Sequence, residues 1–181
     1  MSKDLGIITQ DVHSLRHELG FPGMKVLQFA FDGDPANLYL PHNFDRNCVV
    51  YTGTHDNDTT TAWFQQLDWD AQERVRGYLG RDGSDIAWDL IRLAYSSVAD
   101  LAIVPLQDVL RLGSDARMNV PGAAQGNWGW RFRDDALTGG LADGLRLFAS
   151  QYHRLTDTGR PTGFDPYDYT APGTAHPLNQ E

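Results

Sequence analysis

Short apolar segments and amphipathic segments alternate along the chain. The apolar segments span residues 24–31, 48–54 and 99–105, and Gly, Pro or Asp residues border them. Runs of this length that contain β-branched or aromatic residues are typical of strands buried on both faces. Apolar residues at helical spacing predict helices in the remaining segments, over residues 10–19, 60–66, 71–79, 85–96 and 144–153.

Capping residues support the predicted helix ends. Thr9 stands where the first helix begins, and Gly20 and Pro22 follow its last turn. Ser, Thr, Asp and Asn are the residues that cap helix N-termini, whereas Gly and Pro end helices. By the same reasoning, Asp70 is the expected N-cap of the 71–79 helix, and either Asp58 or Thr59 could cap the helix near residue 60.

The order of helices and strands predicts an α/β fold. Strands that alternate with helices pair in parallel through helical crossovers. Three strands are too few for a complete (β/α)8 barrel, which needs eight strands and about 250 residues. The chain also begins in a polar segment with no strand before it. We therefore expect residues 1–155 to be the C-terminal segment of a larger parallel fold, with unpaired strand edges that would make the isolated chain prone to aggregate.

The last part of the chain differs in composition from the rest. Pro, Gly, Thr and Asp dominate residues 156–181. Such a segment has too few apolar side chains to offset the entropy lost on folding. Residues 156–181 are therefore predicted to form a disordered tail.

Composition and charge exclude several classes of partner. The chain has 15 basic and 24 acidic residues and a formal net charge of −9. Nucleic acid and anionic membranes need a basic surface, so neither is expected as a partner, whereas uncharged sugars are compatible. The sequence has no signal-peptide core and no apolar run long enough to span a membrane. Cys48 is the only cysteine, which rules out an intrachain disulfide, and the expected location is the cytoplasm.

A run of polar residues follows the second predicted strand. His55, Asp56, Asn57 and Asp58 follow Gly53 and Thr54. In α/β barrels the reacting groups lie where strands end, because the loops there converge. The alternative is turn chemistry alone, since Asp and Asn side chains readily bond their own backbone. The run is therefore either part of a reaction centre or a capped turn.

Calcium binding is a further possibility that the spacing argues against. Asp32-Gly33-Asp34 and Asp56-Asn57-Asp58 each place two carboxylates two positions apart. An EF-hand loop continues with a third oxygen ligand and then a glycine. Ala36 occupies the ligand position after Asp34, and no glycine follows. No metal site is therefore expected. Residues 57–59 also fit a glycosylation sequon, which would matter only in a secreted protein.

Five segments carry a family resemblance. They are residues 4–6 (DLG), 22–31 (PGMKVLQFAF), 39–43 (YLPHN), 51–59 (YTGTHDNDT) and 127–131 (NWGWR). In this order they resemble the 4-α-glucanotransferases, also called amylomaltases or disproportionating enzymes, which are related to the α-amylases. The resemblance implies part of a (β/α)8 barrel that acts on α-1,4-glucans (maltodextrins) by a retaining mechanism without a cofactor. It also implies that the missing N-terminal part of the same barrel is a partner.

The resemblance assigns roles to particular residues. Asp56 matches a third catalytic carboxylate that holds sugar hydroxyls, and His55 matches a histidine that binds the same sugar. Both side chains suit this role, since a carboxylate accepts hydroxyl protons and a neutral imidazole can donate one. Asp32, Asn57 and Asn127 are further candidates for substrate binding. Trp128 and Trp130 could stack on sugar rings, but core or wall positions are favoured.

Two departures from the family pattern bear on activity. The nucleophilic Asp of the family belongs to a strand upstream of every segment present here, and Lys3 stands where the family has its acid/base Glu. A lysine ammonium is a poor proton donor to a glycosidic oxygen. We therefore expect the isolated chain to be inactive. A non-catalytic remnant or carbohydrate-binding fragment, or part of another α-amylase-group hydrolase, remains an alternative.

Overall fold

A parallel sheet of three strands lies at the centre of the part of the chain that the computed structural model describes, residues 10–155. Strand β2 (Cys48–Tyr51) lies between β1 (Gly23–Val26) and β3 (Leu101–Ile103). Both pairings are parallel, and the register aligns Met24 with Val49 and Val49 with Leu101. The prediction of parallel strands is confirmed, and α-helices connect β2 to β3, but the connection from β1 to β2 contains only 3-10 turns at residues 27–29 and 41–43 instead of a helical crossover.

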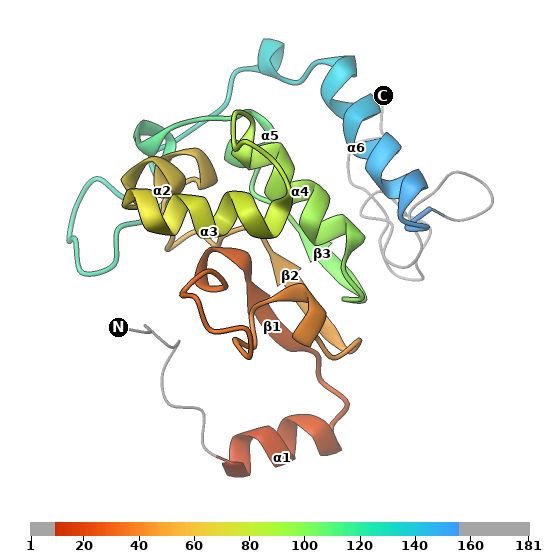
Figure 1. Cartoon of the computed structure of the whole chain (residues 1–181). Helices are drawn as coiled ribbons and strands as arrows, with labels where there is room; N and C mark the ends of the chain where they lie inside the picture. The colour runs from red at the N-terminus through yellow and green to blue at the C-terminus, as the bar shows by residue number, and fades with distance from the viewer. Residues whose placement is uncertain (1–9, 156–181) are drawn as a thin grey trace, which may run out of the picture.

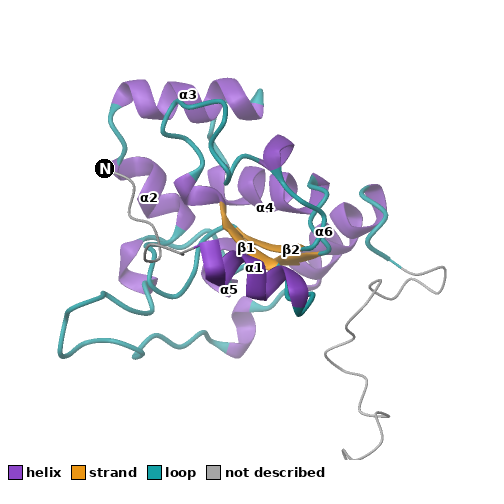
Figure 2. Cartoon of the chain, turned by 90° about the horizontal axis from the view of Figure 1, so that it is seen from below, coloured by secondary structure: helices purple, strands orange, loops and turns teal. Residues whose placement is uncertain are grey.

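Helices cover one side of this sheet. Helices α2, α3 and α4 connect β2 to β3 and lie together on one side of it, whereas α1 lies apart near the start of β1 (Figures 1 and 2). Helix α6 packs against α4. The α-helices are α1 (Gln10–Glu18), α2 (Thr60–Gln66), α3 (Trp69–Leu79), α4 (Ile86–Ser96), α5 (Leu106–Val109) and α6 (Gly139–Gln151).

The two faces of the sheet have different environments. Val50 on the helix side is fully buried and belongs to the main hydrophobic core, together with Phe64 of α2 and Leu90 of α4. On the opposite face, Met24 and Ile103 remain 42% and 48% exposed. Because a parallel sheet is normally covered on both faces, the part of this second face around Met24 and Ile103 lacks a cover among the described residues, whereas Val26 on the same face is fully buried.

Local signals explain the helix ends, with one correction. The Thr59 hydroxyl accepts the Ala62 N–H at 3.3 Å and caps α2, as the sequence suggested. Helix α3 begins at Trp69, two residues earlier than expected, and its cap is Asp68, not Asp70. The Asp68 carboxylate accepts the Ala71 N–H at 2.8 Å. Because Asp70 lies inside the helix, it instead places a negative charge in the positively polarised first turn.

All three predicted strands are shorter in the structure than in the sequence interpretation, and β2 ends at Tyr51 instead of residue 54. The segment 24–31 is extended only to Val26, and residues 27–29 form a 3-10 turn. The reason is pairing, since Val26 is aligned with Tyr51, the last residue of β2, and no strand continues beside it. Strand β3 likewise covers only the three residues that pair with β2. The four-residue helix α5, which follows Pro105, was not predicted.

Helix α6 is longer than predicted and packs closely on α4 through one of its glycines. It begins at Gly139 rather than at residue 144. Its glycines have a low intrinsic preference for helix, but Gly144 lies against the Trp88 ring of α4, where an added Cβ would come within 2.7 Å of Trp88 Cη2. The glycine therefore permits a close helix–helix approach whose packing outweighs the poor local propensity.

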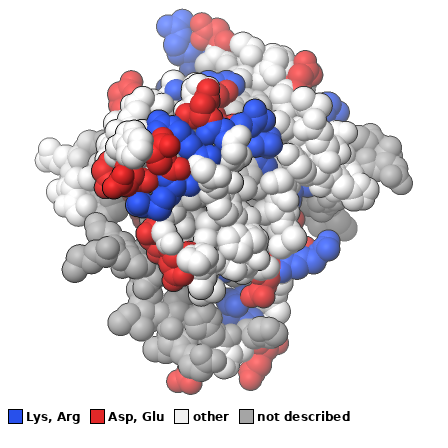
Figure 3. Space-filling model, viewed as in Figure 1, with Lys and Arg blue, Asp and Glu red and all other residues white. Residues whose placement is uncertain are grey.

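The charges on the surface are mixed in sign. Basic and acidic side chains lie beside each other over α3 and α4 (Figure 3), where Arg76 pairs with Glu73 at 2.6 Å and Arg81 with Asp89 at 3.8 Å. Within residues 10–155, no helix is both long and apolar enough to cross a membrane. The predicted 156–181 tail, the Thr9 cap and Lys3 lie outside the described residues.

Candidate functional site

A cavity of about 430 Å³ opens at the carboxyl ends of strands β2 and β3. Its wall is formed by residues 53–59 after β2, residues 103–105 at the end of β3, and Trp128 from a distant loop. The loop 53–59 carries His55, Asp56 and Asn57, so the structure brings three of the predicted site residues to one cavity.

A glycine allows the loop to leave β2 at this point. A Cβ on Gly53 would come within 2.6 Å of Gln28 Nε2. The Gln28 side chain is buried, and its amide donates a hydrogen bond to the Asp58 carbonyl at 3.0 Å. Gln28 therefore passes close beneath the loop and holds its far end, which requires the residue at position 53 to have no side chain.

Asp56 is fixed on one side and free on the other. Its Oδ1 accepts a hydrogen bond from Asn119 Nδ2 at 2.6 Å, and its main-chain carbonyl accepts one from Arg117 Nη2 at 2.7 Å. Its side chain is 43% exposed. Within the described residues no hydrogen-bond donor reaches Oδ2 of Asp56. One carboxylate oxygen is therefore anchored and the other is available to accept a hydrogen bond from a ligand.

His55 lies between Asp56 and an aromatic ring. Its Nε2 is 3.4 Å from Asp56 Oδ1, and its ring centroid is 5.1 Å from that of Trp128. The His55 carbonyl accepts the Asn119 N–H at 3.1 Å, and the Met118 carbonyl accepts the Trp128 N–H at 2.7 Å. Residues 118–119 therefore hold both the histidine and the tryptophan.

Trp128 adopts a backbone conformation that is uncommon for a residue with a bulky side chain. Its φ is +60°, in the left-handed region, which costs free energy unless neighbouring contacts impose it. The side chain is 54% exposed and lines the cavity. The structure therefore places Trp128 in the wall, one of the two positions the sequence favoured, while Trp130 packs near Phe132, with ring centroids 6.4 Å apart.

Asn57 shows the turn chemistry that was the alternative interpretation of this run, whereas Asp58 is bonded by side chains from outside the loop. Asn57 Oδ1 accepts hydrogen bonds from the Thr54 N–H at 2.9 Å and the Thr54 hydroxyl at 2.8 Å. Asp58 Oδ2 accepts from the Ser114 hydroxyl at 2.6 Å and from Gln66 Nε2 at 3.0 Å. Both residues line the cavity, but these bonds use their side-chain oxygens to shape the loop.

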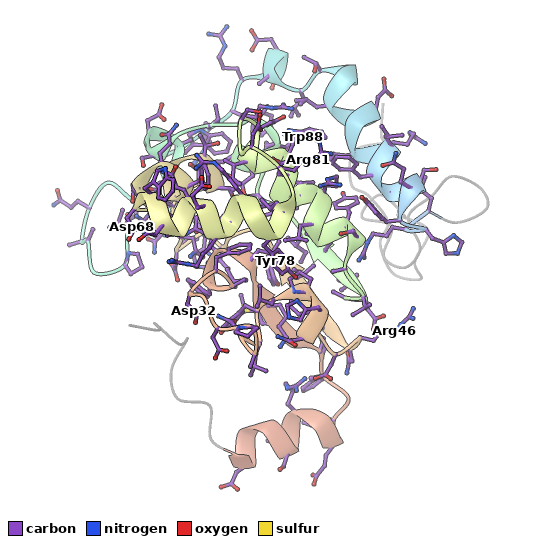
Figure 4. All side chains as sticks on the ribbon, in the orientation of Figure 1. Asp32, Arg46, Asp68, Tyr78, Arg81 and Trp88 are labelled. Carbon is purple, nitrogen blue, oxygen red and sulfur yellow. The ribbon has the colours of Figure 1, made fainter. Side chains whose placement is uncertain are left out.

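Asp32 and Asn127 lie apart from the cavity wall. Asp32 is on the loop that follows β1 (Figure 4), and its Oδ1 accepts the Asp34 N–H at 3.0 Å, which lowers the pKa of this carboxyl. The Asn127 side chain is bonded to backbone, accepting from the Val120 N–H and donating to the Ala123 carbonyl, both at 2.9 Å. In the described part of the chain, neither residue belongs to the cavity lining.

Sequence reasoning missed Asp108, which is buried beside the loop and only 1% exposed. Its carboxylate accepts hydrogen bonds from the hydroxyls of Thr52 and Thr60 at 2.6 and 2.7 Å and from the Thr60 N–H at 2.8 Å. Burial raises the pKa of Asp108, and the three hydrogen bonds only partly offset this. The rule that polar residues after a strand deserve scrutiny, applied to the strand at 99–105, would have singled it out.

Asn119 and Arg117 were also missed, and no local pattern marks them. Both contact Asp56 across more than 60 residues of sequence.

Within residues 10–155, no three His, Cys, Asp or Glu side chains are grouped so that they could hold a metal ion.

Comparison with known proteins establishes the family. A family model described as 4-alpha-glucanotransferase, glycoside hydrolase family 77, matches residues 1–138. The chain belongs to the 4-alpha-glucanotransferase family. It is 56% identical over 156 residues to the 4-alpha-glucanotransferase of Synechocystis sp., which covers 85% of this chain and 31% of that protein. It is 45% identical over 163 residues to the enzyme of Thermus thermophilus, covering 86% of this chain and 33% of that protein.

A solved structure of this family is similar in fold. The amylomaltase from Streptococcus agalactiae in complex with acarbose superposes with a TM-score of 0.80 and 34% sequence identity, over 83% of this chain and 31% of that one. The family member described here therefore spans about a third of the length of its relatives, and its α/β architecture with a parallel sheet matches part of an amylomaltase.

Proposed function

We propose that this chain is the C-terminal portion of a 4-α-glucanotransferase that transfers α-1,4-glucan segments between maltodextrins by a retaining double displacement. The proposal rests chiefly on one observation: Asp56 is anchored through one oxygen while the other is free beside His55, at the mouth of a cavity. The similar amylomaltase was solved with acarbose bound, which supports α-glucans as the ligand class. A cytoplasmic location is part of this proposal.

Asp56 and His55 together suit the recognition of a sugar ring. The free Asp56 Oδ2 can accept a hydroxyl proton, and the neutral imidazole of His55 can donate or accept one. Asn119 holds Asp56 in place from the other side at 2.6 Å. A carboxylate that is fixed before the ligand arrives needs little reorganisation to stabilise a distorted ring in the transition state. We assign Asp56 this stabilising role and His55 hydroxyl binding.

Among residues 10–155, the cavity offers no carboxylate for the two remaining roles. A retaining mechanism needs a nucleophile and an acid/base whose carboxyl groups lie about 5–5.5 Å apart. Besides Asp56, the carboxylates that line the cavity are Asp58 and Asp108, and both are engaged with neighbouring side chains. Lys3 occupies the acid/base position of the family pattern. We therefore propose that the chain alone does not transfer glucans.

The uncovered face of the sheet supports a role within a larger barrel. Met24, Leu101 and Ile103 are apolar, share this face and are each more than 40% exposed. The side chains that point into a parallel barrel are typically large and apolar and pack in layers. We propose that these residues contribute to the interior of a (β/α)8 barrel whose other strands precede this segment.

A chimera tests the proposed function directly. In it, the chain from Asp4 onward replaces the matching part of the 56%-identical Synechocystis enzyme, which keeps its own residue at the position of Lys3, and glucose release from maltotriose is measured. We expect the chimera to disproportionate maltotriose, the isolated chain to release no detectable glucose, and Asp56→Asn in the chimera to lower the rate about a hundredfold or more. An Asp56→Asn chimera as fast as its parent would contradict the assigned role.

The chimera also separates catalysis from binding alone. The pairing of Asp56 and His55 with the Trp128 wall could hold a sugar without any reaction, which is the carbohydrate-binding alternative. If the isolated chain binds acarbose while a folded chimera shows no transfer, that alternative is favoured.

A further inference from the structure

One buried carboxylate holds both ends of the loop that carries the candidate site. Thr52 is the residue before the loop and Thr60 is the residue after it, and Asp108 bonds to both. We propose that Asp108 is a positioning residue that sets the conformation of residues 53–59 and thereby orients His55 and Asp56 toward the ligand. The inference rests on the proposed function only for the identity of that ligand.

Three hydrogen bonds hold the Asp108 carboxylate in one orientation. Its Oδ2 accepts the hydroxyls of both Thr52 and Thr60, at 2.6 and 2.7 Å, and Oδ1 accepts the Thr60 N–H at 2.8 Å. Thr52 and Thr60 are fully buried, and Asp108 is nearly so. A buried carboxylate that loses a donor cannot replace it with water at no cost. The three groups therefore fix the separation between the end of β2 and the start of α2.

The same element also places the side chains that hold Asp56. Asp108 lies in α5, and the chain continues from there to Arg117 and Asn119. The neighbouring Gln107 is buried and donates to the Ala116 carbonyl at 3.2 Å, which ties this segment back to α5. Asp108 of α5 therefore bonds the residues at both ends of the loop 53–59. The segment that follows α5 bonds the middle of the loop, through Arg117 and Asn119.

Another helix shows what a carboxylate cap does when it has only a local role. Asp68 caps α3 through a single bond to the Ala71 N–H, three residues away and outside the cavity lining. Asp108 bonds the first residue of α2 from 48 residues away in sequence. Asp68→Asn is therefore a matched control, because it weakens a helix cap without touching the loop.

The test compares Thr52→Val with Thr52→Ser in the full chain. Valine keeps the shape of threonine but removes the donor to Asp108, whereas serine keeps the hydroxyl. Amide hydrogen exchange is measured at Thr54, Asn57 and Thr60, whose N–H groups are bonded within the loop network. We expect exchange at these amides to be about tenfold faster in Thr52→Val and close to the parent rate in Thr52→Ser.

Asp108→Asn and acarbose binding complete the experiment. Asp108→Asn should accelerate the same amides, and Asp68→Asn should lower the melting temperature without changing them. If Asp108→Asn does not fold, Thr52→Val decides alone. Unchanged loop exchange in Thr52→Val would overturn the proposal, as would loop amides in the parent chain that exchange as fast as an unfolded peptide.

Acarbose affinity distinguishes the inference from the function it rests on. We expect Thr52→Val to bind acarbose about tenfold more weakly than Thr52→Ser, because the site residues are no longer held in place. Altered exchange with no acarbose binding by the parent chain would support the positioning role and count against the proposed function. Altered exchange with equal acarbose affinity in the two variants would overturn the link from the loop to the ligand.

Discussion

The loops that follow β1 and β2 have the same spacing of aspartates, but the carboxylates of the two loops bond different partners. Each contains two aspartates separated by one residue, at 32 and 34 and at 56 and 58. After β1, the carboxylates of Asp32 and Asp34 accept N–H groups two residues further along, at 3.0 and 2.9 Å. After β2, the two carboxylates are bonded by side chains that arrive from distant segments.

The difference shows what turns a polar loop into a site. Where the carboxylates of a loop accept hydrogen bonds from the loop's own backbone N–H groups, as Asp32 and Asp34 do, they stay at the surface. Where distant groups anchor the loop, as Asn119 anchors Asp56, an oxygen can remain unpaired and directed at a cavity. That arrangement needs the tertiary structure to hold it, because an unpaired carboxylate oxygen stabilises nothing by itself.

The sharpest test of this contrast removes one charge from each loop. Asp56→Asn should weaken acarbose binding by the chain about thirtyfold, since a hydrogen bond to a charged group contributes about 2 kcal/mol. Asp32→Asn should change the affinity by less than about twofold, because Asp32 lies outside the cavity wall. Isothermal titration calorimetry measures both. A large loss with Asp32→Asn would instead support substrate contact by Asp32, as the sequence suggested.

A pair of asparagines sharpens the comparison next. Asn119 bonds the Asp56 carboxylate, whereas Asn127 bonds only backbone. Asn119→Ala should therefore reduce acarbose affinity about tenfold, because Asp56 is no longer held in one position. Asn127→Ala should leave affinity unchanged and lower the free energy of unfolding by about 1 kcal/mol.

Urea unfolding measured beside the binding titration separates the two effects. Equal losses of affinity in the two variants would indicate that the loop around residues 120–127 contacts the ligand, in agreement with the expectation for Asn127 from sequence.

The sequence predicted the elements well where the pattern alone determined them. The three parallel strands and the 60–66 helix are found as expected. The errors lie at the ends of elements: β1 stops because β2 ends at Tyr51, and α6 begins at Gly139, five residues earlier than expected. The end of a partner strand cannot be seen in a window of neighbouring residues.

The candidate site was predicted only in part, for the same reason. His55 and Asp56 share a strand-end motif and were identified from it. Asn119, Arg117 and Asp108 act on that motif from 48 to 63 residues away. Asp108 follows a predicted strand and could have been found by the same rule, whereas no local spacing marks Asn119 or Arg117.

Glycines at the two strand exits test the contrast at the level of the backbone. Gly53→Ala should push Gln28 from the Asp58 carbonyl, since the new Cβ would lie 2.6 Å from Gln28 Nε2. Gly33 has φ +101°, so Gly33→Ala strains only its own turn. Each should lower the free energy of unfolding by about 1 kcal/mol, but only Gly53→Ala should also weaken acarbose binding. Affinity loss in both would show that the exits are not independent.

The smallest effect expected is a pH dependence of stability that has opposite signs for Asp32 and Asp108. The Asp34 N–H lowers the pKa of Asp32 below its ordinary value of 3.8, whereas burial raises the pKa of Asp108 above 3.8. Asp32 therefore contributes stability that is present above about pH 4 and is lost as the pH falls through its folded-state pKa. The contribution of Asp108 is fully present below pH 3.8 and is lost as the pH rises through its folded-state pKa.

Because the two contributions change in different pH ranges, that of Asp32 below pH 3.8 and that of Asp108 above it, the single variants should reveal each one separately. Relative to Asp32→Asn, the parent should lose stability on acidification below pH 4. Relative to Asp108→Asn, it should gain stability as the pH is lowered toward 3.8. Urea unfolding at several pH values measures the difference in stability between the parent and each variant. The contributions of the other carboxylates cancel in these differences, because the parent and the variant share them. If both differences had the same sign, Asp108 would behave as a second surface aspartate, and its burial beneath the site loop would be contradicted.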